Sequence, residues 1–215
     1  MKASSAARRW LPIAAGVGAV AIAGATARGR GRDLDRRLYR VLNRPARPVV
    51  DRCFEAITEL GSIWASGAAA AVMAGRGRGR EGLDALGAAG AMWAIGQLLK
   101  KAVRRPRPYD ALTEVRLRID RPRGTSWPSS HPAVLLAFVS VASRDVGASR
   151  LVRGGLAALA GAVGVSRVAL GVHYPADVAG GLLLGGGLAG LWSGAVSPRI
   201  VGSPPSLGMA GTVTR

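Results

Sequence analysis

The sequence predicts an all-α fold, a bundle of six transmembrane helices with a short amphipathic helix at the membrane interface. Hydrophobic residues make up 49% of the 215 residues, and the mean hydropathy is +0.22. The apolar residues form blocks of Ala, Val, Leu and Gly that are separated by arginines. Such blocks are typical of helical membrane proteins, because a span needs about 20 consecutive apolar residues. We therefore expect a multi-pass cell membrane protein that contacts membrane lipids.

The charge of the chain is strongly positive. Lys and Arg number 30 against 12 Asp and Glu, which gives a net charge of +18. In a soluble protein this excess would favour nucleic-acid binding. Aromatic residues, however, make up only 5% of the chain, and many are tryptophans near the ends of apolar blocks. That placement fits an interfacial aromatic belt better than a base-stacking platform, so we expect no nucleic-acid partner.

The N-terminal segment, residues 1–33, contains the first expected span. The block at 10–27, "WLPIAAGVGAVAIAGATA", follows the basic residues Arg8 and Arg9. Its last three residues resemble a signal-peptidase site, but the block is long for a signal peptide, which favours an uncleaved span. Residues 34–43, "LDRRLYRVLN", then place apolar residues at helical spacing among arginines. This pattern predicts an amphipathic helix that lies on the membrane surface.

Five further apolar blocks complete the expected bundle. They lie at 57–75, at 82–99, from Pro132 onward, at 154–172 and at 178–196. Repeated small residues, as in "GGLLLGGGLAG" at 180–190, either let helices approach closely or reflect a biased composition. The tail at 197–215 has Pro and Ser without apolar periodicity, so we expect it to be disordered.

Arg167 lies inside the apolar block at 154–172, where a charge is costly. Such an arginine either faces a polar cavity or extends its side chain to the headgroups. His173 and Asp177 follow it closely in the sequence. A carboxylate beside a histidine fixes the tautomer and raises the basicity of the other ring nitrogen, although a helix cap is the alternative interpretation of Asp177. This segment combines a cation, a proton-transfer group and a carboxylate.

A second cluster of basic residues lies between the third and fourth blocks. It consists of Lys100, Lys101, Arg104, Arg105 and Arg107, and Pro108 follows. Any one of these could be an ordinary positive flank of a span. Arg107 stands between two prolines in "RPRP", which stiffen its backbone. A fixed guanidinium suits bidentate phosphate binding.

The third cluster is "TSWPSSHPA" at 125–133. Ser129 and Ser130 precede the expected helix, and serine caps with an early proline are favoured helix starts. A helix N-terminus with free N–H groups is an anion site, and His131 would stand there to give or take a proton. We expect Trp127 to mark the membrane interface.

The residue inventory argues against metal and disulfide chemistry. Cys53 is the single cysteine, which excludes an internal disulfide and a cysteine-based zinc cluster. The three clusters also hold too few carboxylates and histidines for a hydrolytic metal centre. The sequence therefore predicts a phosphate site that uses no metal and no cofactor.

Together the three clusters resemble the three-part signature of the type 2 phosphatidic acid phosphatase (PAP2) superfamily, in order and in internal spacing. The parts are Lys100–(six residues)–Arg107–Pro108, Pro128–Ser129–Ser130–His131, and Ser166–Arg167–(five)–His173–(three)–Asp177. The resemblance implies a PAP2-like phosphatase core over residues 34–196.

The resemblance also implies a role for each site residue. His173 would be the nucleophile that forms a phosphohistidine, and Asp177 would orient and activate it. His131 would protonate the leaving lipid oxygen and then accept a proton from the attacking water. The residues expected to hold the phosphoryl oxygens are Lys100, Arg107, Ser129, Ser130 and Arg167.

Two residues depart from the pattern of the family. Ser130 stands where the family usually has glycine, and serine would be strained if the backbone there had a positive φ. Pro132 stands where a small residue other than proline is commoner, and it removes one backbone donor from the helix start. Neither departure deletes a side chain that takes part in the chemistry.

The expected function is therefore hydrolysis of a lipid phosphate or pyrophosphate. Candidate substrates are phosphatidic acid, phosphatidylglycerophosphate, polyprenyl pyrophosphates and polyprenyl-phosphosugar phosphates. One alternative is a vanadate-dependent haloperoxidase-like enzyme, a group that shares the phosphate cage but is larger and soluble. The other is a non-catalytic lipid-phosphate binder or transporter, against which the presence of His131, His173 and Asp177 argues. The oligomeric state is not predicted.

The side of the membrane that carries the site is predicted differently by two criteria. With six spans, 11 of the 30 lysines and arginines lie on the face of the termini and 19 lie with the site. The positive-inside rule would then place the site in the cytoplasm. The resemblance implies an extracytoplasmic site in many relatives. We favour the extracytoplasmic side, because a phosphate site itself requires cations.

Overall fold

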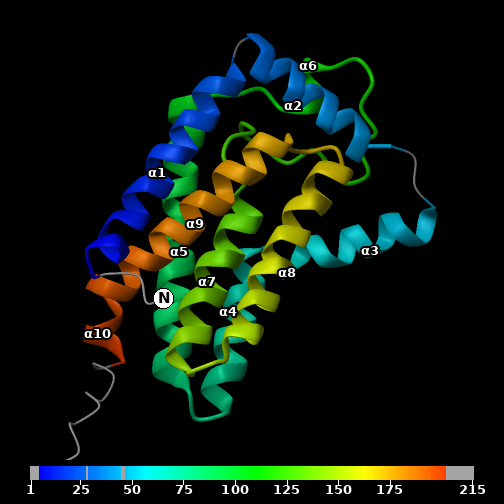
Figure 1. Cartoon of the computed structure of the whole chain (residues 1–215). Helices are drawn as coiled ribbons and strands as arrows, with labels where there is room; N and C mark the ends of the chain where they lie inside the picture. The colour runs from blue at the N-terminus through cyan, green and yellow to red at the C-terminus, as the bar shows by residue number, and fades with distance from the viewer. Residues whose placement is uncertain (1–4, 28, 45–46, 202–215) are drawn as a thin grey trace, which may run out of the picture.

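Helices account for nearly all the regular structure in a computed structural model that describes residues 5–27, 29–44 and 47–201 (Figure 1). The helices are α1 (Ser5–Ala27), α2 (Gly29–Leu42), α3 (Pro48–Glu59), α4 (Ile63–Gly75), α5 (Gly79–Val103), α6 (Pro108–Ala111), α7 (Ser130–Asp145), α8 (Arg150–Ala169), α9 (Pro175–Ala195) and α10 (Ser197–Ile200). The all-α prediction is confirmed. The segment 197–215, which was expected to be disordered, begins with the short helix α10. Its residues 202–215 lie outside the described part of the chain.

The direction of the helices gathers the predicted site residues at one end of the bundle. The C-terminal ends of α5 and α8 lie beside the N-terminal ends of α7 and α9, and α2 and α6 cross above them (Figure 1). The residues of the three sequence clusters belong to these helix ends or to the loops that join α5 to α7 and α8 to α9. The chain therefore concentrates its polar side chains at this end.

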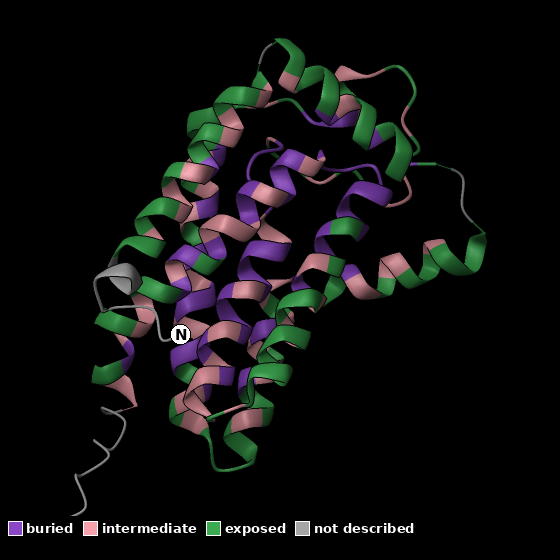
Figure 2. Ribbon diagram, viewed as in Figure 1, coloured by how far each residue is buried: buried purple, intermediate pink, exposed green. Residues whose placement is uncertain are grey.

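Helix α7 lies at the centre and carries much of the apolar core. Its buried residues pack with those of α5, α8 and α9, whereas α1 and α3 are largely exposed (Figure 2). Exposed apolar helix surface is expected where lipid replaces water. A Cβ added to Gly181 would lie 2.4 Å from Ser129 O, and one added to Gly185 would lie 2.4 Å from Ala133 O. These glycines of α9 are therefore required for close packing on α7.

The second expected span, 57–75, is broken. Helices α3 and α4 meet at a bend of 64°, and the break covers residues 60–62. Ser62 caps α4, because its side chain accepts a hydrogen bond from Ala65 N at 3.0 Å. Gly61 lies against His131, and a Cβ on this glycine would be 2.7 Å from that of the histidine. The break thus places Gly61, which has no side chain, against His131 of the predicted site.

Three described helices are long and apolar enough to cross a membrane by themselves. They are α1, over Trp10–Ala27, together with α8 and α9, and the bent pair α3–α4 would make a fourth span. Helix α7 has 16 residues, which corresponds to about 24 Å and is shorter than a hydrocarbon core of about 30 Å. Six spans are therefore not reached by length and composition, because neither α5 nor α7 is among these candidates: α5 has 25 residues but is not apolar enough, and α7 is short and starts within the polar end of the bundle.

Helix α2 corresponds to the expected amphipathic segment and starts five residues earlier, at Gly29. Its buried residues are Asp35 and Tyr39, whereas Leu34 and Leu38 are exposed. The polar face therefore packs on the bundle and the apolar face points outward, as expected for a helix beside lipid.

Candidate active site

A cavity of about 270 Å³ brings together residues from all three sequence clusters. Those that line it are Lys100, Arg107, Ser130, His131, Arg167 and His173. Asp177 and Ser129 are fully buried and are not among its lining residues. The folding of the chain thus joins residues that are up to 73 positions apart around one space of the size of a small ligand.

His173 lies in the loop between α8 and α9 and is backed by Asp177, which is on the first turn of α9. The distance from His173 Nδ1 to Asp177 Oδ2 is 3.5 Å. The same carboxylate oxygen accepts hydrogen bonds from the Ser126 hydroxyl and, at 2.8 Å, from Tyr174 N. These bonds fix the carboxylate on the Nδ1 side of the ring, so that Nε2 faces the cavity cations.

Arg107 is held rigidly at the opposite side of the His173 ring. Its Nε donates to Gly124 O at 2.9 Å and its Nη1 donates to Val172 O at 3.0 Å. Nη1 also lies 3.4 Å from His173 Nε2. Backbone carbonyls therefore orient the guanidinium without neutralising it, which leaves its charge available to an anion in the cavity.

Two further cations complete the wall. Lys100 Nζ donates to Thr125 O at 3.0 Å, and Arg167 Nη1 donates to Thr58 Oγ1 at 3.1 Å. Within the described part of the chain, the buried Arg167 Nε has no hydrogen-bond partner. A buried donor without a partner is costly, so an anionic ligand at this position would satisfy it. Arg167 therefore faces a polar cavity and does not extend to the headgroups.

The N-terminus of α7 contributes backbone donors. Ser130 has helical geometry, and Arg104 is the one non-glycine residue with positive φ among the described residues. Serine is therefore unstrained at this position. Ser129 donates its backbone N–H to Asp177 O at 3.0 Å, while its side chain makes no capping hydrogen bond. The first N–H groups of α7 thus remain unpaired within the helix and can meet an anion.

A second carboxylate and an arginine, which the sequence did not single out as site residues, stand behind Asp177. Arg105 Nη1 lies 2.7 Å from Asp177 Oδ1, and Arg105 Nη2 lies 2.5 Å from Asp35 Oδ2. Asp35 Oδ1 accepts from Ala176 N at 2.9 Å. The signal for Arg105 was its place in "RRPRP"; Asp35 had none, because its arginine partner is 70 residues away in the chain.

Trp127 is not at the membrane interface as the sequence suggested. Its side chain is 1% exposed and lies against α9, where a Cβ on Gly180 would be 2.6 Å from the indole nitrogen. The absent side chain of this glycine makes room for the ring. The exposed tryptophans that line the catalytic-site cavity are instead Trp64 and Trp93, and Trp64 is 85% exposed.

The electrostatics of the site keep His173 neutral. Complete burial lowers the pKa of His173 well below its usual 6.5, and the neighbouring charges of Lys100, Arg107 and Arg167 lower it further. A neutral imidazole retains the lone pair that a nucleophile needs. Burial also raises the pKa of Asp35, against the opposing effect of Arg105.

An all-α membrane bundle in which buried cations surround a histidine backed by a carboxylate has the parts of a phosphoryl-transfer site, where positioning and charge stabilisation dominate. The chain belongs to the PAP2 superfamily, which residues 81–200 match. This region is more than half of the chain, and the resemblance inferred from the three clusters is confirmed.

Among characterised relatives, the chain is similar to decaprenylphosphoryl-5-phosphoribose phosphatase of Mycobacterium tuberculosis, in strains CDC 1551 and H37Rv. The two sequences are 38% identical over 108 residues, which are 50% of this chain and 57% of the relative. The chain thus spans little more than half the length of the curated relatives it matches.

Two crystal structures share the fold. One is the transmembrane PAP2-type phosphatidylglycerolphosphate phosphatase from Bacillus subtilis, with a TM-score of 0.72 and 24% identity over 86% of this chain and 95% of that one. The other is Aquifex aeolicus LpxE, with a TM-score of 0.68 and 25% identity over 75% and 95% of the two chains. The transmembrane PAP2 fold is therefore shared over most of the chain.

Proposed function

We propose that this protein is a membrane lipid phosphatase that hydrolyses a phosphomonoester or pyrophosphate through a phosphohistidine, without a metal ion. The observation that carries the proposal is the position of His173, with Asp177 on one ring nitrogen and Arg107 beside the other. The proposed nucleophile thus has its orienting carboxylate on one side of the ring and a fixed phosphate-binding cation on the other.

The first chemical step is attack by His173 Nε2 on phosphorus. Asp177 accepts the hydrogen bond from Nδ1–H and stabilises the positive charge that develops on the ring. Lys100, Arg107 and Arg167 hold the phosphoryl oxygens. Burial and the neighbouring cations lower the pKa of free His131, and the negative charge of the bound phosphate offsets those cations, so that the imidazolium forms with substrate in place. His131 then gives this second proton to the departing lipid oxygen as the P–O bond breaks, and a phosphohistidine and a lipid alcohol result.

The second step is hydrolysis of the phosphohistidine. His131, now without its proton, accepts one from a water molecule whose oxygen attacks phosphorus. The P–N bond breaks, His173 regains its neutral form, and inorganic phosphate leaves. The backbone N–H groups at Ser129–Ser130 and the helix N-terminus add to the phosphate cage in both steps.

The substrate is proposed to enter from the lipid side of the bundle. The lining of the cavity includes Trp64 of α4 and Trp93 of α5, which are both exposed, and Gln97 of α5, which is half-buried. Aromatic residues of this kind suit the boundary between headgroups and acyl chains. Because the characterised relatives are named as phosphatases of decaprenylphosphoryl-5-phosphoribose, we propose a polyprenyl-phosphosugar phosphate as the first substrate to test.

The site is proposed to face the extracytoplasmic side. A cysteine-accessibility scan of the loop at 110–123 tests this orientation, after replacement of the exposed Cys53 by serine. Labelling in intact cells supports it, whereas labelling that requires permeabilisation would reverse it.

Phosphate release from a panel of lipid phosphates tests the activity and the nucleophile together. The panel contains a polyprenyl-phosphosugar phosphate, phosphatidylglycerophosphate, phosphatidic acid and a polyprenyl pyrophosphate, in detergent with a metal chelator. We expect release by the wild type and none by His173→Ala, with an acid-labile phosphoryl group on the wild type after a rapid quench. Equal release by both proteins would disprove the mechanism, and no release from any lipid would disprove the activity.

A further inference from the structure

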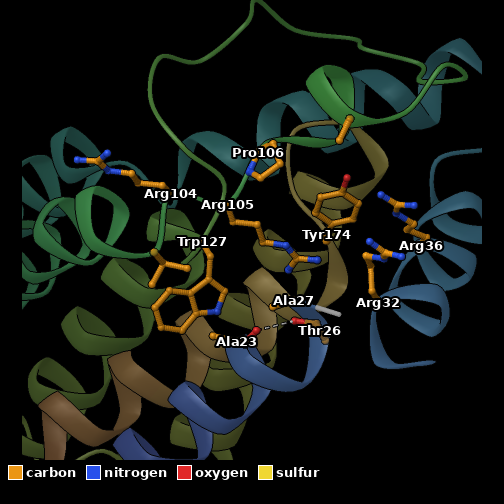
Figure 3. Close-up of a pocket in the computed structure, with 12 residues that line it drawn as sticks. Ala23, Thr26, Ala27, Arg32, Arg36, Arg104, Arg105, Pro106, Trp127 and Tyr174 are labelled. Carbon is orange, nitrogen blue, oxygen red and sulfur yellow. Dashed lines mark hydrogen bonds between the residues drawn. The ribbon is translucent and has the colours of Figure 1, made fainter. Parts of the chain in front are cut away.

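A second cavity, of about 300 Å³, lies between α1, α2 and the residues that follow α5 (Figure 3). It shares no lining residue with the catalytic cavity, and neither histidine lines it. Arg105 and Tyr174 form part of its wall, and the guanidinium of Arg105 lies over the Tyr174 ring at 4.3 Å. The cavity is therefore separate from the site of phosphoryl transfer, but its wall contains Arg105, which forms an ion pair with Asp177.

The cavity has an excess of positive charge. Arg32 and Arg36 extend from α2 toward Arg105 and Tyr174, whereas Arg104 points away (Figure 3). Arg105 already binds Asp35 and Asp177, and Arg32 lies 4.0 Å from the exposed Asp33. Among the described residues, Arg36 has no carboxylate within ion-pair distance. Two flexible cations on one side of a cavity can close on an anionic group.

Much of the remaining wall of the cavity is apolar. It includes Ala23 and Ala27 of α1, Val103 and, on the inner side, the buried indole of Trp127. Helix α1 is a candidate membrane span with little buried surface. The apolar face of α2 is exposed beside it, so the cavity opens where a membrane surface would meet both helices. A ligand here combines an anionic group with an adjoining apolar part.

We propose that this cavity is a second phosphate-binding site, which takes the phosphodiester headgroup of an anionic membrane lipid. Arg32 and Arg36 bind the phosphate oxygens, and the apolar walls contact the start of the acyl chains. The lipid is a ligand and is not hydrolysed, because the walls offer no histidine to act as a nucleophile. A free phosphate ion would satisfy the arginines but not use the apolar walls.

Thermal unfolding in detergent, followed by tryptophan fluorescence, tests the site. The added ligands are short-chain phosphatidylglycerol, short-chain phosphatidylcholine and inorganic phosphate. The proteins are the wild type, the double variant R32Q/R36Q, and R37Q/R40Q, which removes the same charge from the same helix but from residues that do not line the cavity. The Tm of each protein without ligand shows whether it is folded.

Saturating phosphatidylglycerol is expected to raise the Tm of the wild type and of R37Q/R40Q by about 2–4 °C, and that of R32Q/R36Q by much less. Equal shifts in all three proteins, or none, would overturn the site. An equal shift with phosphatidylcholine would overturn the choice of an anionic headgroup. A shift with inorganic phosphate alone that is lost in R32Q/R36Q would overturn the lipid in favour of the free anion. Because the readout is unfolding, these results do not depend on phosphatase activity.

Discussion

Arg105 Nη1 lies 2.7 Å from Oδ1 of Asp177, on the carboxylate oxygen that does not face His173. The arginine therefore fixes the carboxylate from behind, and its second nitrogen is fixed in turn by Asp35. The carboxylate of Asp177, on α9, is thus linked by two ion pairs through Arg105, in the loop after α5, to Asp35 of α2.

The first prediction concerns this support. Arg105→Gln and Asp35→Asn are each expected to lower kcat, by up to about 100-fold, with little change in KM, because Asp177 and His173 lose their alignment while the phosphate cage remains. Arg104→Gln is the matched control, since Arg104, the residue that follows α5, is exposed and its side chain donates a hydrogen bond to Lys101 O. A rise in KM at constant kcat would contradict a positioning role.

The second prediction separates acid catalysis from nucleophilic attack. His131→Ala is expected to reduce the turnover of a lipid phosphate by about 10²–10⁴-fold, because the lipid alkoxide needs a proton to leave. An aryl phosphate, whose leaving group is far less basic, should lose much less. Rapid-quench measurement of phosphoenzyme formation with both substrates provides the comparison. Equal losses with both would rule out the acid role of His131.

The third prediction is a pH dependence of His173. Because burial and three cations lower its pKa below 6.5, the ring should stay neutral as the pH falls through 6.5, and protonate only in more acidic solution. The chain has two histidines, so NMR of ¹⁵N-histidine-labelled His131→Gln reports on His173 alone. An ordinary titration near 6.5 would show that the ring is not shielded. The unfolded chain takes up this proton at a higher pH than the folded chain, so the free energy of unfolding should decrease as the pH is lowered from 6.5.

The fourth prediction uses the break between α3 and α4. Gly61→Ala would place a methyl group 2.7 Å from His131 Cβ, 2.8 Å from Val163 Cγ1 and 2.9 Å from His131 O. Overpacking of this kind costs about 1–3 kcal/mol, and here it also displaces His131, so both Tm and kcat should fall. Gly67→Ala, in the same helix pair with open space around its Cα, should leave activity unchanged and keep or raise the Tm.

The fifth prediction concerns the serine that replaces the usual glycine. The Ser130 hydroxyl is buried without a hydrogen-bond partner in the described structure. Ser130→Gly is therefore expected to preserve activity or raise it modestly, and Ser130→Ala shows whether the hydroxyl or the backbone matters. A collapse of kcat in both variants would reveal a role for the hydroxyl.

The three clusters that meet at the cavity could be found in the sequence because each cluster is local in the chain. His173 stands just before α9 and Asp177 on its first turn, so their four-residue spacing brings them together. The bend before α4 also had a signal in the sequence, because Gly61 favours the end of a helix and Ser62 favours the start of the next. The apolar residues on both sides nevertheless favoured one continuous span.

Other features depend on contacts that no local pattern carries. Trp127 was expected at the interface because tryptophans gather there, yet the missing side chain of Gly180 gives it a buried place. Asp35 lies in the segment 34–43, which was predicted only as a surface helix, because apolar residues among arginines give no sign of a partner distant in sequence. In both cases tertiary packing decides the environment, and amino-acid type alone does not.

The buried carboxylate of Asp35 has a consequence for where the functional unit ends. The residues that match the family, 81–200, hold every motif, but Asp35 precedes them by more than 40 positions. A fragment restricted to the matched region would contain all the proposed site residues and yet leave Arg105 with one counter-ion of two. We therefore expect the smallest active fragment to begin at or before α2, and shorter fragments to regain activity only when the missing N-terminal helices are supplied as a separate chain.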